Sequence, residues 1–329
     1  MIELELGDVS RRVVEDLAEV TADEEVLVIA EAGDTAVARA VTVAARGVGA
    51  TASLVVMPRL DAHGNEPPAG IAAAMREVDV CFTATTHAIT HTESRIAASE
   101  AGTRVVVLRG VTEDIMVEGG MNTDYEALRE RTAAVRDALD AATEARVTAP
   151  AGTDVTFGLE GRPAFSIDGF FHGYGFSALP PGESPTAPAA GTAEGTVVVD
   201  YSMDNLGLLD EPLELAFEGG FVTDVGGGSD AARLERLLAD ADENAGNMAE
   251  FAIGTNPDAR LVGNLAEDKK KLGTVHFAVG DNTSLDGDLG SDIHLDAVVL
   301  DPTVELDGRT VLAAGELDRE ALAAVADGG

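Results

Sequence analysis

Continuous apolar runs alternate with helix-like segments over the first 145 residues of the chain. The apolar runs are short and rich in valine, leucine and isoleucine, which is typical of strands that are buried on both faces. The predicted strands are 25–30, 51–57, 78–83 and 104–108, and the predicted helices are 34–46, 70–76, 91–101 and 124–142. Regular alternation of strand and helix indicates an open parallel sheet. We therefore expect residues 1–145 to form a Rossmann-like α/β domain.

The pattern changes near residue 146, where glycine, proline and threonine become frequent. Short runs of alternating apolar and polar residues replace the continuous ones, and they are typical of antiparallel strands with one face in solvent. The predicted strands are 155–159, 195–201, 213–217 and 221–225, followed by a helix at 230–241 capped by Ser229, a hairpin at 303–308 and a helix at 317–326. Residues 177–195 are rich in proline, glycine and alanine and are predicted to be a loop. Residues 146–329 are thus expected to form an α+β, mostly antiparallel domain.

The charge of the chain is strongly acidic along its whole length. Aspartate and glutamate number 59 against 22 basic residues, which gives a net charge of −37, and 19 of the basic residues are arginine. Such a surface repels nucleic acid and anionic membranes, so we exclude both as partners. An acidic chain that almost lacks lysine is typical of a protein that stays soluble in high salt, where its self-repulsion is screened. The composition predicts a halophilic protein.

Features that would mark secretion or membrane insertion do not occur in the sequence. Cys81 is the single cysteine, so no disulfide can form within the chain. It lies in an apolar run and is expected to be a small buried hydrophobic residue. The N-terminal segment lacks the basic and apolar regions of a signal peptide, and no apolar run approaches the 18 residues of a membrane span. We expect a cytoplasmic protein.

Candidate metal ligands gather in residues 249–296. His276 lies in the apolar run 275–279, and His294 and Asp296 lie in a second run of alternating residues. Side chains two apart in a strand point to the same face, so His294 and Asp296 are expected to project together. Two imidazoles with carboxylates on neighbouring strands suit zinc, iron, manganese or cobalt. The alternative is that these histidines are ordinary buried residues with structural hydrogen bonds.

Five motifs of the second half occur together in one order. They are AGTDVTF at 151–157, PGE at 181–183, AEFAIGTNP at 249–257, GTVHFAVG at 273–280 and HLD at 294–296. This order resembles the thermophilic metallo-aminopeptidases of the aminopeptidase T and aminopeptidase S type, which are leucyl aminopeptidase-like enzymes. It equally resembles their iron-dependent relatives, the 2,5-dihydroxypyridine dioxygenases. The resemblance is good over the second half of the chain and loose over the first.

The aminopeptidase resemblance implies a site for two divalent ions, zinc, cobalt or manganese, and a peptide substrate. The residues that match its ligands are Glu183, Glu250, His276, His294 and Asp296. Glu250 would bridge the ions or act as general base toward a metal-activated water. The family's tyrosine ligand has no counterpart, because Thr283 stands at its position, which weakens the case for two ions. The alternative for Glu183 is a solvated acid in a loop.

The dioxygenase resemblance implies one Fe(II) ion held by His276, His294 and Asp296, with open positions for dioxygen and an aromatic diol. It also implies a histidine of the first domain that acts as a base toward the substrate. His91 is the better match and His87 the second choice, and the alternative for His91 is a solvent-facing residue at a helix start. The missing tyrosine ligand and this histidine favour the dioxygenase.

Three functions remain open after the sequence is read. Because Glu183 and Glu250 are both present, we place a metallo-aminopeptidase-like hydrolase first and an Fe(II) dioxygenase second. A non-catalytic metal-binding protein is the third. The resemblance also implies a homodimer or a higher homo-oligomer.

All three lysines of the chain occur together just before the His276 run. Lys271 is predicted to meet an anionic group of the substrate. The alternative is that the lysines form surface ion pairs with Glu267 and Asp268, which contribute little to stability.

Overall fold

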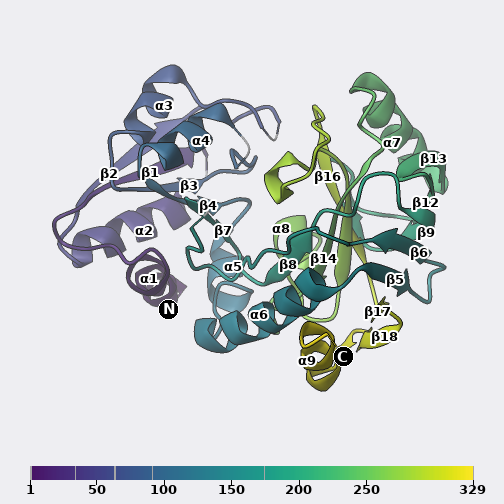
Figure 1. The fold of residues 1–329 in the computed structure, drawn as a ribbon. Coiled ribbons are helices and arrows are strands. Elements are labelled where there is room, and N and C mark those ends of the chain that lie inside the picture. Colours follow the sequence, from purple (N-terminus) through teal and green to yellow (C-terminus); the bar gives the residue numbers. More distant parts are fainter. Residues whose placement is uncertain (1, 34, 63, 91, 174, 329) are drawn as a thin grey trace. The chain divides into compact units, whose positions relative to one another are not determined.

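The computed structural model describes residues 2–33, 35–62, 64–90, 92–173 and 175–328 (Figure 1). Contacts divide the chain into two compact units. Unit 1 comprises Met1–Tyr125 with Ile167–Pro181, and unit 2 comprises Glu126–Ser166 with Gly182–Gly329. The division differs from a single boundary at residue 145, because the chain leaves unit 1 after Tyr125 and returns to it for 15 residues.

Unit 1 is built on a five-stranded parallel sheet in the order β2-β1-β3-β4-β7. The strands are β1 (Glu25–Glu31), β2 (Thr51–Met57), β3 (Val80–Ala84), β4 (Arg104–Leu108) and β7 (Phe176–Leu179). The parallel α/β sheet predicted for the first half is therefore confirmed. Strand β7 was not predicted, because three of its four residues, 177–179, lie at the start of the segment assigned to a loop. Pairing with the apolar edge of β4, from Val105 to Leu108, makes this short segment a strand.

Helices cover both faces of this sheet. They are α1 (Ile2–Arg12), the π-helix η1 (Val13–Leu17), α2 (Ala36–Gly47), α3 (Ala69–Met75), α4 (Glu93–Glu100) and α5 (Glu113–Glu118). Val26 and Val28 of β1 join a core with α1, α2 and α5. Leu27 and Ile29 join the opposite core, which includes residues of α3 and α4. Cys81 is buried in that second core, as predicted.

Unit 2 contains two antiparallel sheets, as predicted for the second half. The larger has eight strands in the order β13-β12-β9-β6-β5-β17-β18-β19, and the smaller has six in the order β11-β10-β16-β15-β14-β8. The strands of the larger sheet are β5 (Glu144–Thr148), β6 (Asp154–Gly158), β9 (Glu194–Val199), β12 (Leu213–Glu218), β13 (Phe221–Gly226), β17 (Thr303–Leu306), β18 (Arg309–Ala313) and β19 (Glu316–Leu317). Those of the smaller are β8 (Glu183–Thr186), β10 (Ser202–Met203), β11 (Gly207–Leu208), β14 (Met248–Gly254), β15 (Val275–Gly280) and β16 (His294–Val299).

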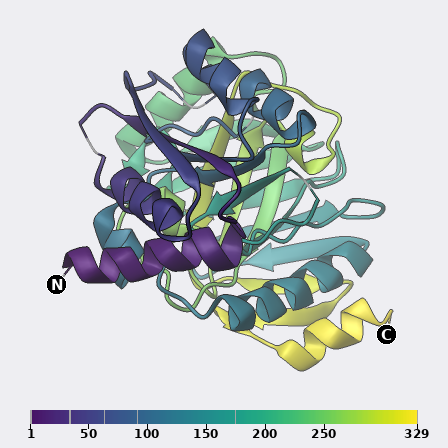
Figure 2. The ribbon, with the colours of Figure 1, turned by 90° about the vertical axis from the view of Figure 1, so that its left-hand side faces the viewer.

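The helices of unit 2 include three that the sequence predicted. They are α6 (Tyr125–Ala141), α7 (Gly228–Asp240) and α9 (Arg319–Ala326). The short helix α8 (Leu265–Asp268) and the 3-10 turn η2 (Thr283–Leu285) were not predicted. Helices α6 and α9 lie side by side and contribute to one core (Figure 2). Two predictions were wrong here. The cap of α7 is Gly227 rather than Ser229, which lies inside the helix, and the predicted loop 177–195 contains strand β8.

The core of unit 2 lies between its two sheets. Phe251 of β14 and Phe277 of β15 have ring centroids 5.4 Å apart, and both contact Phe157 of β6, at 5.0 and 6.0 Å. All three rings are almost completely buried. Because successive strand residues face opposite sides, the neighbours of these rings, Glu250 and His276, must project from the other face of the six-stranded sheet.

Among the described residues, no helix is long and apolar enough to cross a bilayer.

Candidate metal centre

Four neighbouring strands of the six-stranded sheet carry the predicted ligands. Glu250 lies opposite Ala278, and Ala278 lies opposite Asp296. His276 lies opposite Ala252, and His294 lies opposite Gly280. Directly paired residues share a face of a sheet, as do residues two apart on one strand. The register therefore places Glu250, His276, His294 and Asp296 on one face.

Glu183 reaches the same face from the edge strand β8, where it pairs with Gly254. The residue before it is Gly182, with φ of 119°, and a Cβ there would overlap Asn256. The carbonyl of Gly182 accepts a hydrogen bond from the Thr255 backbone at 2.8 Å. A glycine is therefore required to bring Glu183 against the neighbouring strand. Glu183 is only 4% exposed, so it is not a solvated loop acid.

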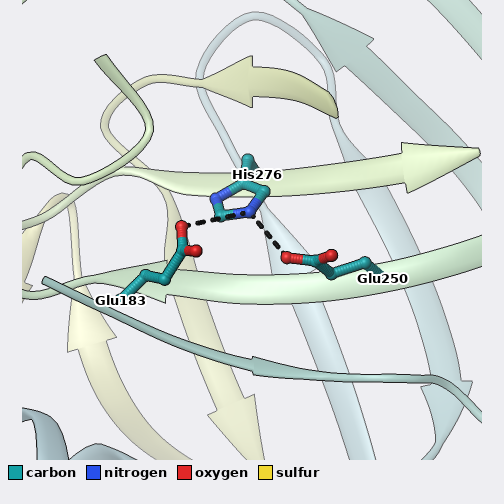
Figure 3. A group of neighbouring side chains, drawn as sticks. All are labelled: Glu183, Glu250 and His276. Atoms are coloured by element: carbon teal, nitrogen blue, oxygen red, sulfur yellow. Dashed lines mark hydrogen bonds and ion pairs between the residues drawn. The ribbon is translucent and has the colours of Figure 1, made fainter. Parts of the chain in front are cut away.

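His276 lies between two carboxylates, as Figure 3 shows. Its Nε2 atom is 2.9 Å from Glu250 Oε1 and 3.5 Å from Glu183 Oε2. The three residues are buried, and Glu183 Oε2 has no hydrogen-bond partner among the described residues. A buried carboxylate oxygen that faces an imidazole nitrogen without a hydrogen bond is the arrangement expected where a cation binds.

His294 completes a second group of ligand atoms. Its Nε2 atom is 3.2 Å from Glu250 Oε2 and 3.3 Å from Asp296 Oδ1. Within each group, Glu183–Glu250–His276 and Glu250–His294–Asp296, the ligand atoms lie within 4.8 Å of one another. Two ligands about 2.1 Å from one ion are separated by roughly 3.0–3.4 Å at right or tetrahedral angles. Both groups therefore fit a divalent metal, and Glu250 belongs to both.

The hydrogen bond at Nδ1, the ring nitrogen that faces away from the carboxylates, sets the tautomer of neutral His294. Nδ1 lies 2.7 Å from the backbone carbonyl of Asp281. A carbonyl oxygen only accepts hydrogen bonds, so Nδ1 carries the proton and donates it. The lone pair of a neutral His294 is then on Nε2, which faces the carboxylates. A backbone carbonyl that accepts a hydrogen bond from the outer ring nitrogen orients histidine ligands in this way in many metal sites.

Two lysines enter the cluster directly after helix α8. Lys269 Nζ lies 2.8 Å from Asp296 Oδ2 and 3.7 Å from Glu183 Oε2, and Lys270 Nζ pairs with Glu183 Oε1. The predicted partners of the lysines are engaged elsewhere. Glu267 pairs with Arg260 at 3.3 Å, and Asp268 accepts a hydrogen bond from Ser202. Surface ion pairing within the 267–271 segment is thus not what these lysines do.

The electrostatics of the cluster keep its carboxylates charged. Burial raises the pKa of Glu250, but hydrogen bonds from His276 and from the doubly protonated form of His294 outweigh it and leave the pKa below its ordinary value. Burial likewise opposes ionisation of Asp296, whose pKa is nevertheless held well below its usual range by the Lys269 ammonium and by His294. Burial lowers the pKa of Lys270 to about 8, against the opposing effect of Glu183. The site thus holds anionic oxygen ligands at neutral pH.

The other predicted site residues lie in different places. Thr283 stands where the resemblance to aminopeptidases implies a tyrosine ligand. It is exposed, and its hydroxyl donates a hydrogen bond to the Asp281 carboxylate at 2.9 Å. Lys271 accepts a backbone hydrogen bond from Thr274 through its carbonyl. His87 belongs to unit 1, where its carbonyl accepts a hydrogen bond from Thr85. His91 lies outside the described residues.

Sequence reasoning missed two kinds of contributor to this cluster, a pair of lysines and a backbone carbonyl. Lys269 and Lys270, rather than Lys271, provide the ammonium groups, and the Asp281 carbonyl orients His294. The concentration of all lysines in one triplet was the available signal for the first. Which of the three lysines faces the carboxylates depends on how α8 ends, and the sequence does not give this.

Comparison with known proteins identifies a family and several similar solved structures. A family model described as 2,5-dihydroxypyridine 5,6-dioxygenase matches residues 7–319. The structure of 2,5-dihydroxypyridine dioxygenase from Pseudomonas putida KT2440 is similar, with a TM-score of 0.83 and 22% identity over 96% of this chain and 97% of that one. Wild-type AmpT from Thermus thermophilus gives a TM-score of 0.72 and 19% identity over 96% and 100%. No curated protein sequence matches significantly.

Proposed function

The chain belongs to the 2,5-dihydroxypyridine 5,6-dioxygenase family, and from this premise we propose that it is an Fe(II)-dependent dioxygenase that opens the ring of a dihydroxylated aromatic compound. The observation that carries the proposal is the family match over 313 residues combined with two imidazoles, one buried and one half-buried, and a buried carboxylate on one sheet face. The sequence alone placed a hydrolase first, and the family match favours the dioxygenase instead. The fold itself is shared with AmpT and does not separate the two.

The ligands in this proposal are His276, His294 and Asp296. A ferrous ion on two imidazoles and one carboxylate supplies open positions at which dioxygen and an aromatic diol react. Imidazole nitrogens and a carboxylate oxygen are the donors that such an ion prefers; His276 and Asp296 are buried here, and the side chain of His294 is 18% exposed. Glu250 lies against both imidazoles, so it acts as a positioning residue for the two histidines.

The surrounding residues prepare these ligands. The Asp281 carbonyl holds the Nδ1 proton of His294, which leaves Nε2 available as a donor. Lys269 holds Asp296 in its ionised form, because an ammonium at 2.8 Å favours the carboxylate over the acid. The chain thus provides a preformed, largely buried and anionic set of ligands, so that little reorganisation is needed when a cation binds.

Oxygen uptake tests the proposal. The protein is loaded anaerobically with Fe(II) in high salt and mixed with 2,5-dihydroxypyridine, and oxygen consumption and loss of the aromatic absorbance are followed together. We expect both signals in the wild type and neither in His294→Ala. Glu214→Gln is the control for a change in this unit, because Glu214 is exposed on β12. A wild type that retains iron yet consumes no oxygen with any dihydroxypyridine contradicts the proposal.

A metallo-aminopeptidase-like hydrolase is the second candidate, and one observation favours it. His276 and His294 belong to different ligand groups that share Glu250 through its two oxygens. A carboxylate that bridges two positions is typical of two-metal hydrolases, which activate a shared water. Turnover of leucyl-p-nitroanilide with Zn(II), Co(II) or Mn(II) supports this candidate over the dioxygenase. Metal binding with neither oxygen uptake nor hydrolysis of leucyl-p-nitroanilide supports a non-catalytic metal-binding protein.

A further inference from the structure

We propose that the ammonium groups of Lys269 and Lys270 take the place of a second metal ion beside Glu183, so that the centre binds one divalent ion per chain. The inference concerns the metal centre of the proposed function but not its reaction. It assigns a specific task to two of the three lysines in a chain that otherwise uses arginine as its basic residue.

Both oxygens of Glu183 already face ammonium nitrogens. Lys270 Nζ pairs with Oε1, and Lys269 Nζ lies 3.7 Å from Oε2. A protonated amine has three donors and no lone pair, so it cannot serve as a metal ligand. A divalent ion bound to Glu183 would therefore sit next to two positive charges in a buried site. Repulsion between such charges is strong where water does not screen it.

The net charge of the cluster stays closer to zero with one divalent ion than with two. Glu183, Glu250 and Asp296 contribute three negative charges, and the two lysines contribute two positive charges. One divalent ion leaves an excess of one positive charge, whereas two ions leave an excess of three. If both ammonium groups were removed, two ions would leave an excess of one, as one ion does in the native protein. The lysines thus set the number of ions that the carboxylates tolerate.

The burial of these lysines supports a dedicated role. The side chains of Lys269 and Lys270 are 12% and 6% exposed. Lysine is costly to bury unless its charge is paired. Both lysines are held by the backbone at the end of α8, where Lys270 N donates to the Glu267 carbonyl at 2.9 Å. The backbone therefore fixes where the ammonium groups enter the cluster.

Metal stoichiometry tests the inference directly. Wild type, Lys269→Met and the double variant Lys269→Met with Lys270→Met are incubated in high salt with excess Mn(II) or Zn(II) and desalted. Metal per chain is then measured by inductively coupled plasma mass spectrometry. We expect one ion in the wild type and two in the double variant. Lys271→Met is the matched control from the same triplet and is expected to stay at one.

Titration calorimetry gives a second readout that does not depend on the double variant folding. Lys269→Met is expected to bind the second ion at least about tenfold more tightly than the wild type does, because one of the opposing charges is gone. Lys269→Arg keeps the charge and is expected to resemble the wild type. Two ions in the wild type overturn the inference, as does a folded Lys269→Met protein whose second-ion affinity is unchanged.

The outcome is separable from that of the proposed reaction. A wild type with one ion and no oxygen uptake contradicts the dioxygenase and supports this inference. A wild type with two ions and full oxygen uptake supports the dioxygenase and overturns this inference.

Discussion

Replacing Phe277 with alanine tests whether the two faces of β15 have separate roles, one packed in the aromatic core and the other carrying a candidate ligand. Phe277 is 1% exposed and lies 5.4 and 6.0 Å from the rings of Phe251 and Phe157. It adjoins His276 in the chain but projects from the opposite face of β15. Removing its ring therefore perturbs the core while it leaves every candidate ligand in place.

The expected size of the effect follows from burial. Truncating a fully buried phenylalanine to alanine costs about 3–5 kcal/mol, because the transfer energy of the ring is lost and a cavity remains. Unit 2 has roughly 190 residues, for which 1 kcal/mol lowers the melting temperature by about 2–4 °C. The melting temperature of this unit should thus fall by about 6–20 °C. Phe277→Leu retains most of the apolar volume and should lower it by much less.

The assay combines calorimetry with metal analysis, both in high salt. Phe277→Ala should melt at a lower temperature yet retain the metal content of the wild type. His276→Ala, one residue away, should lose metal and show a smaller change in the metal-free melting temperature. Addition of metal at 100 times its Kd should stabilise the wild type by about 2.7 kcal/mol. A change below about 2 °C for Phe277→Ala, or loss of metal from that variant alone, would refute the assignment of the two faces of β15.

Three further predictions address the ligands and the turns that position them. Glu250→Gln should weaken metal binding at least about tenfold in calorimetry, because Glu250 contacts both imidazoles. The control Glu214→Gln, at an exposed position, should bind metal as the wild type does. Equal metal affinities of Glu250→Gln and the wild type would contradict the assignment of Glu250 to the metal centre. Gly182→Ala should weaken metal binding and lower the melting temperature because a methyl group has no room there, while Gly161→Ala, where nothing lies within 4 Å, should leave metal affinity unchanged. Hydrogen bonds hold the pKa of Asp307 below its ordinary value despite partial burial, so its stabilising effect is present above pH 4 and is lost as the pH falls through the folded-state pKa. The melting difference between wild type and Asp307→Asn should therefore shrink on acidification, and a difference that grows would contradict this.

The local pattern of the sequence was sufficient for the parallel sheet. Strand β4 has the predicted bounds, 104–108, because a buried strand of a parallel sheet is a continuous apolar run that the chain displays locally. Strand β2, at the edge of the sheet and partly exposed, also has its predicted bounds, 51–57. The hairpin at 303–308 was likewise predicted, since Asp307-Gly308 is a turn signal between two short strands. The polar pattern of residues 2–12 did not predict α1, whose helical state depends on packing against α2 and α5.

The identity of the ligand residues alone does not distinguish a hydrolase from a dioxygenase. The resemblance implied His276, His294 and Asp296 as ligands for both functions, so these three side chains supported either reaction. Preference for the hydrolase rested on the presence of Glu183 and Glu250. The structure gives both glutamates neighbours that the sequence did not reveal, two histidines for Glu250 and two lysines for Glu183.

What the sequence determined by itself is most of the longer strands and helices, and the shared face of His294 and Asp296, because periodicity along an element is a local property. The tertiary structure decided which strands become neighbours, and therefore which atoms meet. Glu183 became buried only because β8, inside a segment that resembles a loop, pairs with β14. Lys269 and Lys270 reached the carboxylates only because α8 ends where it does. Register between strands distant in the chain depends on long-range packing, which no local pattern contains.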